Sequence, residues 1–201
     1  MTLRLGAAVV IAAWAATVAG PAGAEERVWD ASVGASWTDY SQFDDTSFGL
    51  DVTMSRRITS WLAADAQLGF SPSDLGERAF SASRFEGYLG LRGGPRVGAH
   101  QLFAAIRPGF VSLSEAPEPI ICLAIFPPTL GCSLADGETL FALQLGGGLE
   151  LVPSESSVVR VEAGSLLLKY PGPAIAKGFE PFEDSLWSHN LRLGVSVGLR
   201  F

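Results

Sequence analysis

The last eleven residues of the chain, 191–201, alternate between apolar side chains and polar residues or glycine. Every odd position is leucine, valine or phenylalanine, and the even positions include Arg192 and Arg200. Because successive side chains of a strand point to opposite faces, this pattern predicts a strand with one apolar and one polar face. Two arginines exclude burial of the polar face in a soluble core, and the length suits a tilted strand that crosses a bilayer.

Seven further segments show the same alternation, which gives eight predicted strands in all. On one face of each lie aliphatic or aromatic side chains, and on the other lie polar residues or glycine. The eight segments are residues 29–37, 48–55, 61–71, 84–92, 101–112, 140–151, 158–168 and about 187–201.

The links between these segments alternate in length. The short links are residues 56–60, 93–100 and 152–157. The longer ones are residues 38–47, 72–83, 113–139 and 169–186. Short periplasmic turns and longer extracellular loops are typical of outer-membrane barrels. The predicted fold is therefore all-β, an eight-stranded antiparallel up-and-down transmembrane β-barrel with both mature termini in the periplasm.

The end of the chain resembles the C-terminal signal that the assembly machinery of bacterial outer-membrane barrels reads. That signal is a terminal aromatic residue preceded by alternating apolar residues, and Val195, Val197, Leu199 and Phe201 occupy its positions. Leucine at 199 departs from the aromatic residue that is common there. In architecture the chain resembles the small eight-stranded outer-membrane proteins of the A and X type, which include attachment proteins. The resemblance implies outer-membrane lipids, lipopolysaccharide and the assembly machinery as partners.

Residues 1–24 have the order of a cleaved secretory signal. Arg4 precedes an apolar run from Leu5 to about Gly20, and small residues follow just before Glu25. We therefore expect residues 1–24 to be a signal peptide and residues 25–201 to form a single barrel domain in the outer membrane.

The charge and the cysteines exclude several classes of function. The chain has 21 acidic and 14 basic residues, and its net charge of −7 argues against a nucleic-acid partner. Its two cysteines, Cys122 and Cys132, predict one disulfide in an exported protein rather than a metal site. We expect neither a cofactor nor a metal ion.

The polar faces of the predicted strands bring charged residues into the lumen. An eight-stranded barrel is only wide enough for its side chains to fill, so these charges should pair as a structural plug. A gated ion path is the alternative. The lumen residues are six acids and six arginines, namely Asp30, Asp51, Asp65, Glu86, Glu150, Glu162, Arg84, Arg92, Arg107, Arg160, Arg192 and Arg200.

Four tryptophans fall near the ends of predicted strands. They are Trp29, Trp37, Trp61 and Trp187. Tryptophans at these positions are typical of the aromatic girdles at the two membrane interfaces.

Ser188 and His189 are the candidate residues for an enzymatic function. Lipid A deacylases are outer-membrane barrels with a serine and a histidine near the outer leaflet. However, adjacent residues of a strand point to opposite faces, so these two cannot pair directly, and the His-x-Ser spacing of that family is absent. We therefore expect no catalytic residues, with a lipid A-modifying hydrolase or a narrow channel as alternative functions.

The link 113–139 is the longest predicted loop and contains both cysteines. It also carries more apolar side chains than a solvated loop needs, which makes it a candidate contact surface for a host, a partner protein or lipopolysaccharide. The alternative is a loop that the disulfide orders and protects and that has no partner. The apolar contact residues are Ile120, Ile121, Leu123, Ile125 and Phe126. The predicted function is that of an integral outer-membrane barrel with a plugged lumen and a structural or adhesion-type role.

Overall fold

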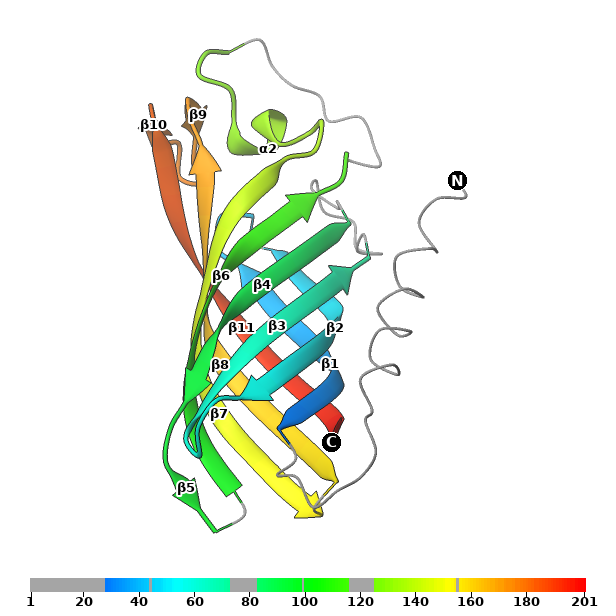
Figure 1. Cartoon of the computed structure of the whole chain (residues 1–201). Coiled ribbons are helices and arrows are strands. Elements are labelled where there is room, and N and C mark those ends of the chain that lie inside the picture. The colour runs from blue at the N-terminus through cyan, green and yellow to red at the C-terminus, as the bar shows by residue number, and fades with distance from the viewer. Residues whose placement is uncertain (1–27, 44, 73–82, 99, 116–124, 155) are drawn as a thin grey trace.

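The computed structural model describes residues 28–43, 45–72, 83–98, 100–115, 125–154 and 156–201. Within these ranges, eight long strands form one closed antiparallel sheet (Figure 1). The strands are β1 (Trp29–Tyr40), β2 (Asp45–Arg57), β3 (Leu62–Ser71), β4 (Arg84–Gly93), β6 (His100–Leu113), β7 (Thr139–Ser154), β8 (Ser157–Pro171) and β11 (Ser185–Arg200).

The barrel closes because each long strand pairs with its neighbours in the chain and the last strand pairs with the first. In the β1–β11 ladder, Val33 lies opposite Val197. Trp29 donates a backbone hydrogen bond to Phe201 (2.9 Å) and accepts one from it (2.8 Å). The predicted fold, an eight-stranded antiparallel barrel, is thereby confirmed.

The two ends of the barrel differ in what connects the strands. At the lower end in Figure 1, called the turn end, lie the short strand β5 (Arg96–Val97) and the C-terminus. At the upper end, called the loop end, β9 (Ala174–Ile175) pairs with β10 (Pro181–Phe182), and the short helix α2 (Leu130–Ser133) lies nearby. In the described part of the chain, no helix is both long and apolar enough to cross a bilayer.

The predicted loop over residues 38–47 is in the right place but too long, because in the structure the connection lies only between Tyr40 and Asp45. Strand β1 continues to Tyr40 and β2 begins at Asp45, and these two residues pair directly. The residues between Trp37 and Phe48 look like loop residues because several are polar. Those that belong to the two strands nevertheless continue the alternation of inward and outward side chains. Thr38 and Ser47, for example, are buried inside the barrel. Polar residues that face a lumen cannot be distinguished by composition from polar residues that face water.

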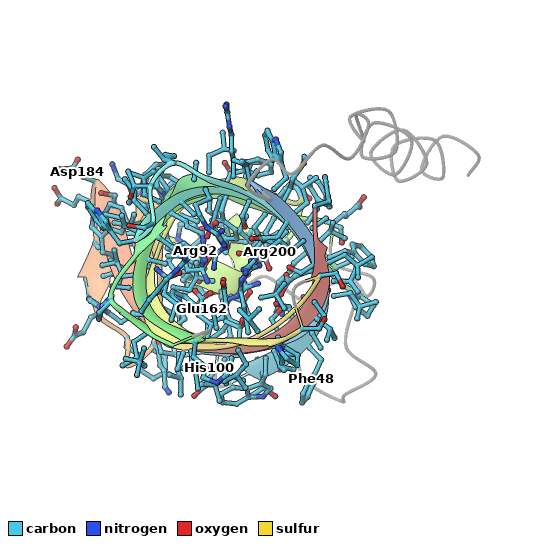
Figure 2. The ribbon with its side chains drawn as sticks, turned by 60° about the horizontal axis from the view of Figure 1, so that its bottom comes forward. Phe48, Arg92, His100, Glu162, Asp184 and Arg200 are labelled. Carbon is cyan, nitrogen blue, oxygen red and sulfur yellow. The ribbon has the colours of Figure 1, made fainter. Side chains whose placement is uncertain are left out.

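The outward face of the barrel is apolar. Figure 2 shows side chains such as Phe48 pointing away from the wall, while Arg92, Glu162 and Arg200 point into the interior. Val33 is 62% exposed and Leu50 is 71% exposed, although both are aliphatic. Soluble monomers rarely expose continuous apolar areas of more than a few hundred Å². The same property recurs on every long strand, at Val33, Leu50, Phe70, Leu89, Ile106, Leu145, Val161 and Val195.

Candidate functional site

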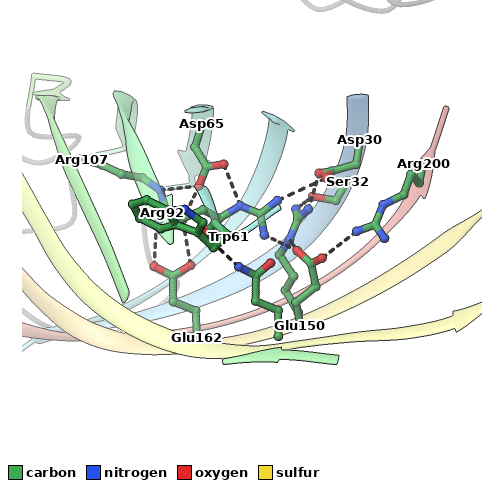
Figure 3. Close-up of polar contacts among 11 residues, drawn as sticks. Asp30, Ser32, Trp61, Asp65, Arg92, Arg107, Glu150, Glu162 and Arg200 are labelled. Carbon is green, nitrogen blue, oxygen red and sulfur yellow. Dashed lines mark hydrogen bonds and ion pairs between the residues drawn. The ribbon is translucent and has the colours of Figure 1, made fainter. Parts of the chain in front are cut away.

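The lumen of the turn-end half contains an ion-pair cluster centred on Arg92 (Figure 3). The Arg92 guanidinium donates to Asp65 at 2.9 Å and to Asp30 at 3.2 Å, and it also pairs with Glu150. Asp30 comes from β1, Asp65 from β3 and Glu150 from β7. Arg92, on β4, therefore connects three other strands. Its side chain is buried, and its charge therefore depends on these carboxylates for compensation.

Three more arginines extend this cluster across the barrel. Arg107 pairs with Asp65 at 2.8 Å and with Glu162 at 2.5 Å. Arg160 pairs with Asp30 and, at 3.0 Å, with Glu150, and it donates to Ser32 Oγ at 3.2 Å. Arg200 pairs with Glu150 at 2.6 Å. This half of the lumen thus holds four arginines and four acids of the predicted set, namely Arg92, Arg107, Arg160, Arg200, Asp30, Asp65, Glu150 and Glu162.

A second cluster lies nearer the loop end, around Arg192. Arg192 pairs with Glu86 at 2.6 Å and with Asp51 at 3.0 Å, and the Tyr88 hydroxyl donates to Glu86 at 2.9 Å. Gly69 leaves the room for this arrangement, because a Cβ there would lie 2.5 Å from an oxygen of each carboxylate. A larger residue at 69 would therefore force the two acids away from the arginine.

The remaining predicted lumen residue, Arg84, has a partner that the sequence analysis missed. It pairs with Asp45 at 3.4 Å, and its guanidinium lies 4.1 Å from the centre of the Tyr40 ring. Asp45 falls within the predicted loop 38–47, although its spacing from Ser47 and Asp51 continues the inward face of β2. That even spacing is the signal that could have identified it.

Toward the loop end the lumen becomes apolar, which the sequence analysis did not predict. Leu130 and Leu134 of the α2 segment are 3% and 0% exposed and pack into the barrel mouth. They belong to the predicted external loop 113–139, and their spacing of four residues is typical of one face of a helical turn. The residues that form this apolar cluster are Tyr40, Tyr88, Val111, Leu113, Leu130, Leu134, Leu140, Ala142, Leu166, Leu168, Tyr170 and Ala174.

A small cavity of about 40 Å³ lies between the two ion-pair clusters. Asp51, Gln144, Arg160 and Arg192 are among the residues that line it. The Gln144 side-chain oxygen is buried without a hydrogen-bond partner in the described structure. Since a single water needs roughly 10–15 Å³ of such space, the cavity accommodates a few waters.

The two long outer connections are joined to each other. The Ile175 amide donates to the Pro128 carbonyl at 2.8 Å, and Thr129 and Ile175 form a parallel bridge. Phe126 precedes Pro128 by two residues and Phe179 follows Ile175 by four, and they are 86% and 88% exposed. Phe179 also has a φ of 64°, a left-handed conformation that costs a bulky residue roughly 1–2 kcal/mol.

Three of the five predicted contact residues lie outside the described residues. These are Ile120, Ile121 and Leu123, together with Cys122, so the disulfide between Cys122 and Cys132 stays a prediction. The predicted contact residues that the structure describes are both exposed, Ile125 at 46% and Phe126 at 86%. The predicted signal peptide, residues 1–24, also lies outside the described ranges.

The predicted girdle and assembly residues all lie on the outer surface. Trp61 is 56% and Trp187 is 44% exposed, while Trp29 and Trp37 are partly covered. The Trp187 ring contacts Phe141 edge to face at 5.9 Å, and Arg56 lies 5.4 Å from the Trp29 ring. The four positions of the C-terminal pattern are exposed on β11 or just after it, namely Val195, Val197, Leu199 and Phe201.

Ser188 and His189 lie on opposite faces of β11. The Ser188 hydroxyl is inside the barrel and donates to Asn190 Oδ1 at 3.1 Å, whereas His189 is exposed opposite Leu167. Ser165 and Asp39 share the outer face with His189, but each pairs across the strands with Leu191. Among the described residues, no hydrogen bond joins His189 to a serine or a carboxylate, so the structure contains no assembled catalytic dyad at this position.

The comparisons with known proteins place this geometry in one class of fold. No protein-family model matches the chain, and no curated protein matches its sequence. Neisserial surface protein A has a similar structure, with a TM-score of 0.56 and 10% identity over 88% of this chain and 98% of that one. The outer membrane protein OprG from Pseudomonas aeruginosa aligns with a TM-score of 0.52 and 9% identity over 86% of this chain and 95% of that one. The chain thus has the fold of the small eight-stranded outer-membrane barrels.

Proposed function

We propose that this protein is an integral barrel of the bacterial outer membrane that acts at the cell surface through its loop end. The apolar outward face supports the location, because a bilayer is the environment that such a surface requires. The proposal includes export by the signal at residues 1–24, assembly through the pattern that ends at Phe201, and a periplasmic turn end.

The observation that carries the surface role is the exposure of Phe126 and Phe179. They are the two most exposed of the large apolar side chains in the described structure. Both lie beyond the strands, on outer connections that are bonded to each other. Exposed aromatic side chains on a rigid scaffold are typical of binding surfaces. We include in this proposal a disulfide between Cys122 and Cys132, which would restrict the loop before binding.

The lumen supports a surface role rather than transport. Its charges are paired, its loop end is filled by apolar side chains, and its central cavity of about 40 Å³ has room for only a few waters. A role in conduction would need a continuous aqueous path. We therefore propose that the lumen is closed.

The test is to replace Ile125 and Phe126 with serine in a strain whose attachment to host cells depends on this protein. Because both side chains are exposed, the barrel should still assemble and migrate with heat-modifiable mobility. We expect attachment to fall by about tenfold or more, the loss of roughly 1.4 kcal/mol of binding free energy. Ile58→Ser, at an exposed apolar side chain of the turn end, is the matched control.

Attachment that stays within twofold of wild type in the Ile125 and Phe126 variant, with normal assembly, would contradict the proposed surface role. Serum resistance and lipopolysaccharide binding should be measured on the same strains. A defect in either one that the Ile58 control lacks would identify the surface role as something other than attachment.

A further inference from the structure

We propose that the loop end binds a cationic polypeptide that carries apolar side chains. The surface concerned, called here the aromatic loop surface, consists of Ile125, Phe126, Phe179, Glu180, Glu183 and Asp184. This inference rests on the proposed surface function and names the chemical class of its partner.

The aromatic side chains are close enough to contact one partner. Pro128 and Ile175 are hydrogen bonded, and Phe126 and Phe179 are two and four residues away from them. If the chain were fully extended from Pro128 to Phe126 and from Ile175 to Phe179, the Cα atoms of the two phenylalanines would be at most roughly 27 Å apart. A standard interface covers about 800 Å² on each partner, which corresponds to a disc roughly 32 Å across. Both phenylalanines fit within it.

Hydrogen bonds hold the backbone on both sides of Phe179. Its amide donates to the Ala176 carbonyl at 3.2 Å, and the Ala176 amide donates to the Glu180 carbonyl at 2.9 Å, which closes the tip of the β9–β10 ribbon. The Lys177 amide donates to the Gln42 side chain at 3.3 Å and ties this tip to the β1–β2 connection. A bulky residue held in the left-handed region is unusual, and such outliers cluster at functional positions. Because the backbone of this tip is already hydrogen bonded, less of the chain has to become ordered when a partner binds.

The charges around these aromatics select a cationic partner. Glu180 follows Phe179 directly, and Glu183 and Asp184 are exposed on the same connection. Figure 2 shows Asp184 outside the barrel wall. The one lysine beside Phe179, Lys177, donates its ammonium group to the Ser41 carbonyl at 3.5 Å. Lys177 keeps its positive charge, so this surface presents three carboxylates against one ammonium group and is acidic on balance.

The rest of the loop end has the same sign of charge. Its exposed acids in the described chain are Glu115, Asp136, Glu138, Glu180, Glu183 and Asp184, against exposed lysines at 169 and 177. The described turn end is the reverse, with Arg56 and Arg96 exposed. An acidic surface attracts basic partners over about a Debye length and repels anionic lipid headgroups and phosphates. This distribution favours a basic polypeptide over lipopolysaccharide as the direct partner.

The probe is a fluorescein-labelled peptide that repeats Lys-Leu-Lys-Ser, titrated with the full barrel in a nonionic detergent. Fluorescence anisotropy in protein-free micelles of the same detergent is subtracted at each point. A second peptide has glutamate in place of lysine, and a third has serine in place of leucine. Vesicles of anionic phospholipid serve as the competing class of partner.

The variants separate the apolar from the electrostatic contribution. We expect Phe126→Ser with Phe179→Ser to weaken binding of the lysine peptide by about tenfold or more. Glu180→Gln, Glu183→Gln and Asp184→Asn together should weaken it by about tenfold at low salt and should remove most of its salt dependence. The matched controls are Val97→Ser, an apolar side chain of the turn end that is 68% exposed, and Glu115→Gln with Glu138→Gln. The Val97 control should stay within twofold, and the Glu115 and Glu138 control, at loop-end acids outside the aromatic loop surface, should weaken binding less than the three-acid variant does.

Binding of the lysine peptide that requires both the phenylalanines and the three acids supports the inference. Three results would overturn it. The first is equal binding of the glutamate peptide, and the second is lysine-peptide binding that neither set of substitutions changes. The third is tighter association of the protein with anionic vesicles than with the lysine peptide. If cell attachment depends on Phe126 but the lysine peptide does not bind, the partner class is wrong while the proposed surface function stands. If the peptide binds as expected but attachment is unchanged, the proposed function fails and the charge preference of the surface stands.

Discussion

Replacing Arg92 with alanine is expected to lower the free energy of unfolding by about 3–5 kcal/mol, the cost of leaving buried charges without a partner. Arg92 contacts Asp30, Asp65 and Glu150 in the lumen, and its own side chain is 5% exposed. Removal of this one guanidinium reduces the arginines of the turn-end cluster to three while its four acids remain. Urea unfolding in detergent micelles, followed by tryptophan fluorescence, measures the change.

Two further variants make this prediction specific. Arg96→Ala, at an exposed residue of β5, should change the free energy of unfolding by no more than about 0.5 kcal/mol. Adding Glu150→Gln to the Arg92→Ala variant removes one of the stranded carboxylates and should recover part of the lost stability. If Arg92→Ala costs no more than Arg96→Ala, the ion pairs of the lumen do not stabilise the barrel.

Replacing Val195 or Leu145 with arginine is expected to cost about 2–4 kcal/mol in a bilayer, the penalty for arginine near the midplane of a lipid-facing surface. Val195 lies near the middle of β11 and is 51% exposed, and Leu145 has a similar position on β7. In water the same substitutions would be nearly neutral, since both sites are already exposed. The large cost arises only if lipid covers this face.

Folding in phospholipid vesicles, with the heat-modifiable shift as the readout, measures this cost. Val97→Arg is the control, because Val97 is 68% exposed but lies in β5 at the turn end. A loss of less than about 0.5 kcal/mol at both 145 and 195 would be the value typical of an ordinary water-exposed site. That result would contradict a membrane-spanning barrel.

The alternation of side chains predicted the number of strands, and the twelve charged residues that it assigned to the lumen face inward in the structure. This success has a physical basis, because a strand with lipid on one side and a filled lumen on the other must repeat every two residues. The same reasoning misplaced Thr38, Tyr40 and Ser47. In a lumen, polar residues continue a strand, and composition alone does not separate them from a loop.

The partners of the lumen charges could not be predicted from the sequence. Arg92 contacts residues 27, 58 and 62 positions away in the chain, and these contacts depend on how far neighbouring strands are staggered. The apolar mouth of the lumen was missed for a different reason. Leu130 and Leu134 belong to a long connection, and only the fold shows that this connection turns back into the barrel.

The central claim is that the barrel is closed and acts through its surface, and conductance across a planar lipid bilayer tests it most directly. We predict that the purified wild-type protein, inserted in known amount, gives no sustained large conductance, because ion pairs and apolar side chains fill the lumen at successive levels. Stable, porin-like current steps from the wild-type protein would show an open aqueous path and would contradict the account.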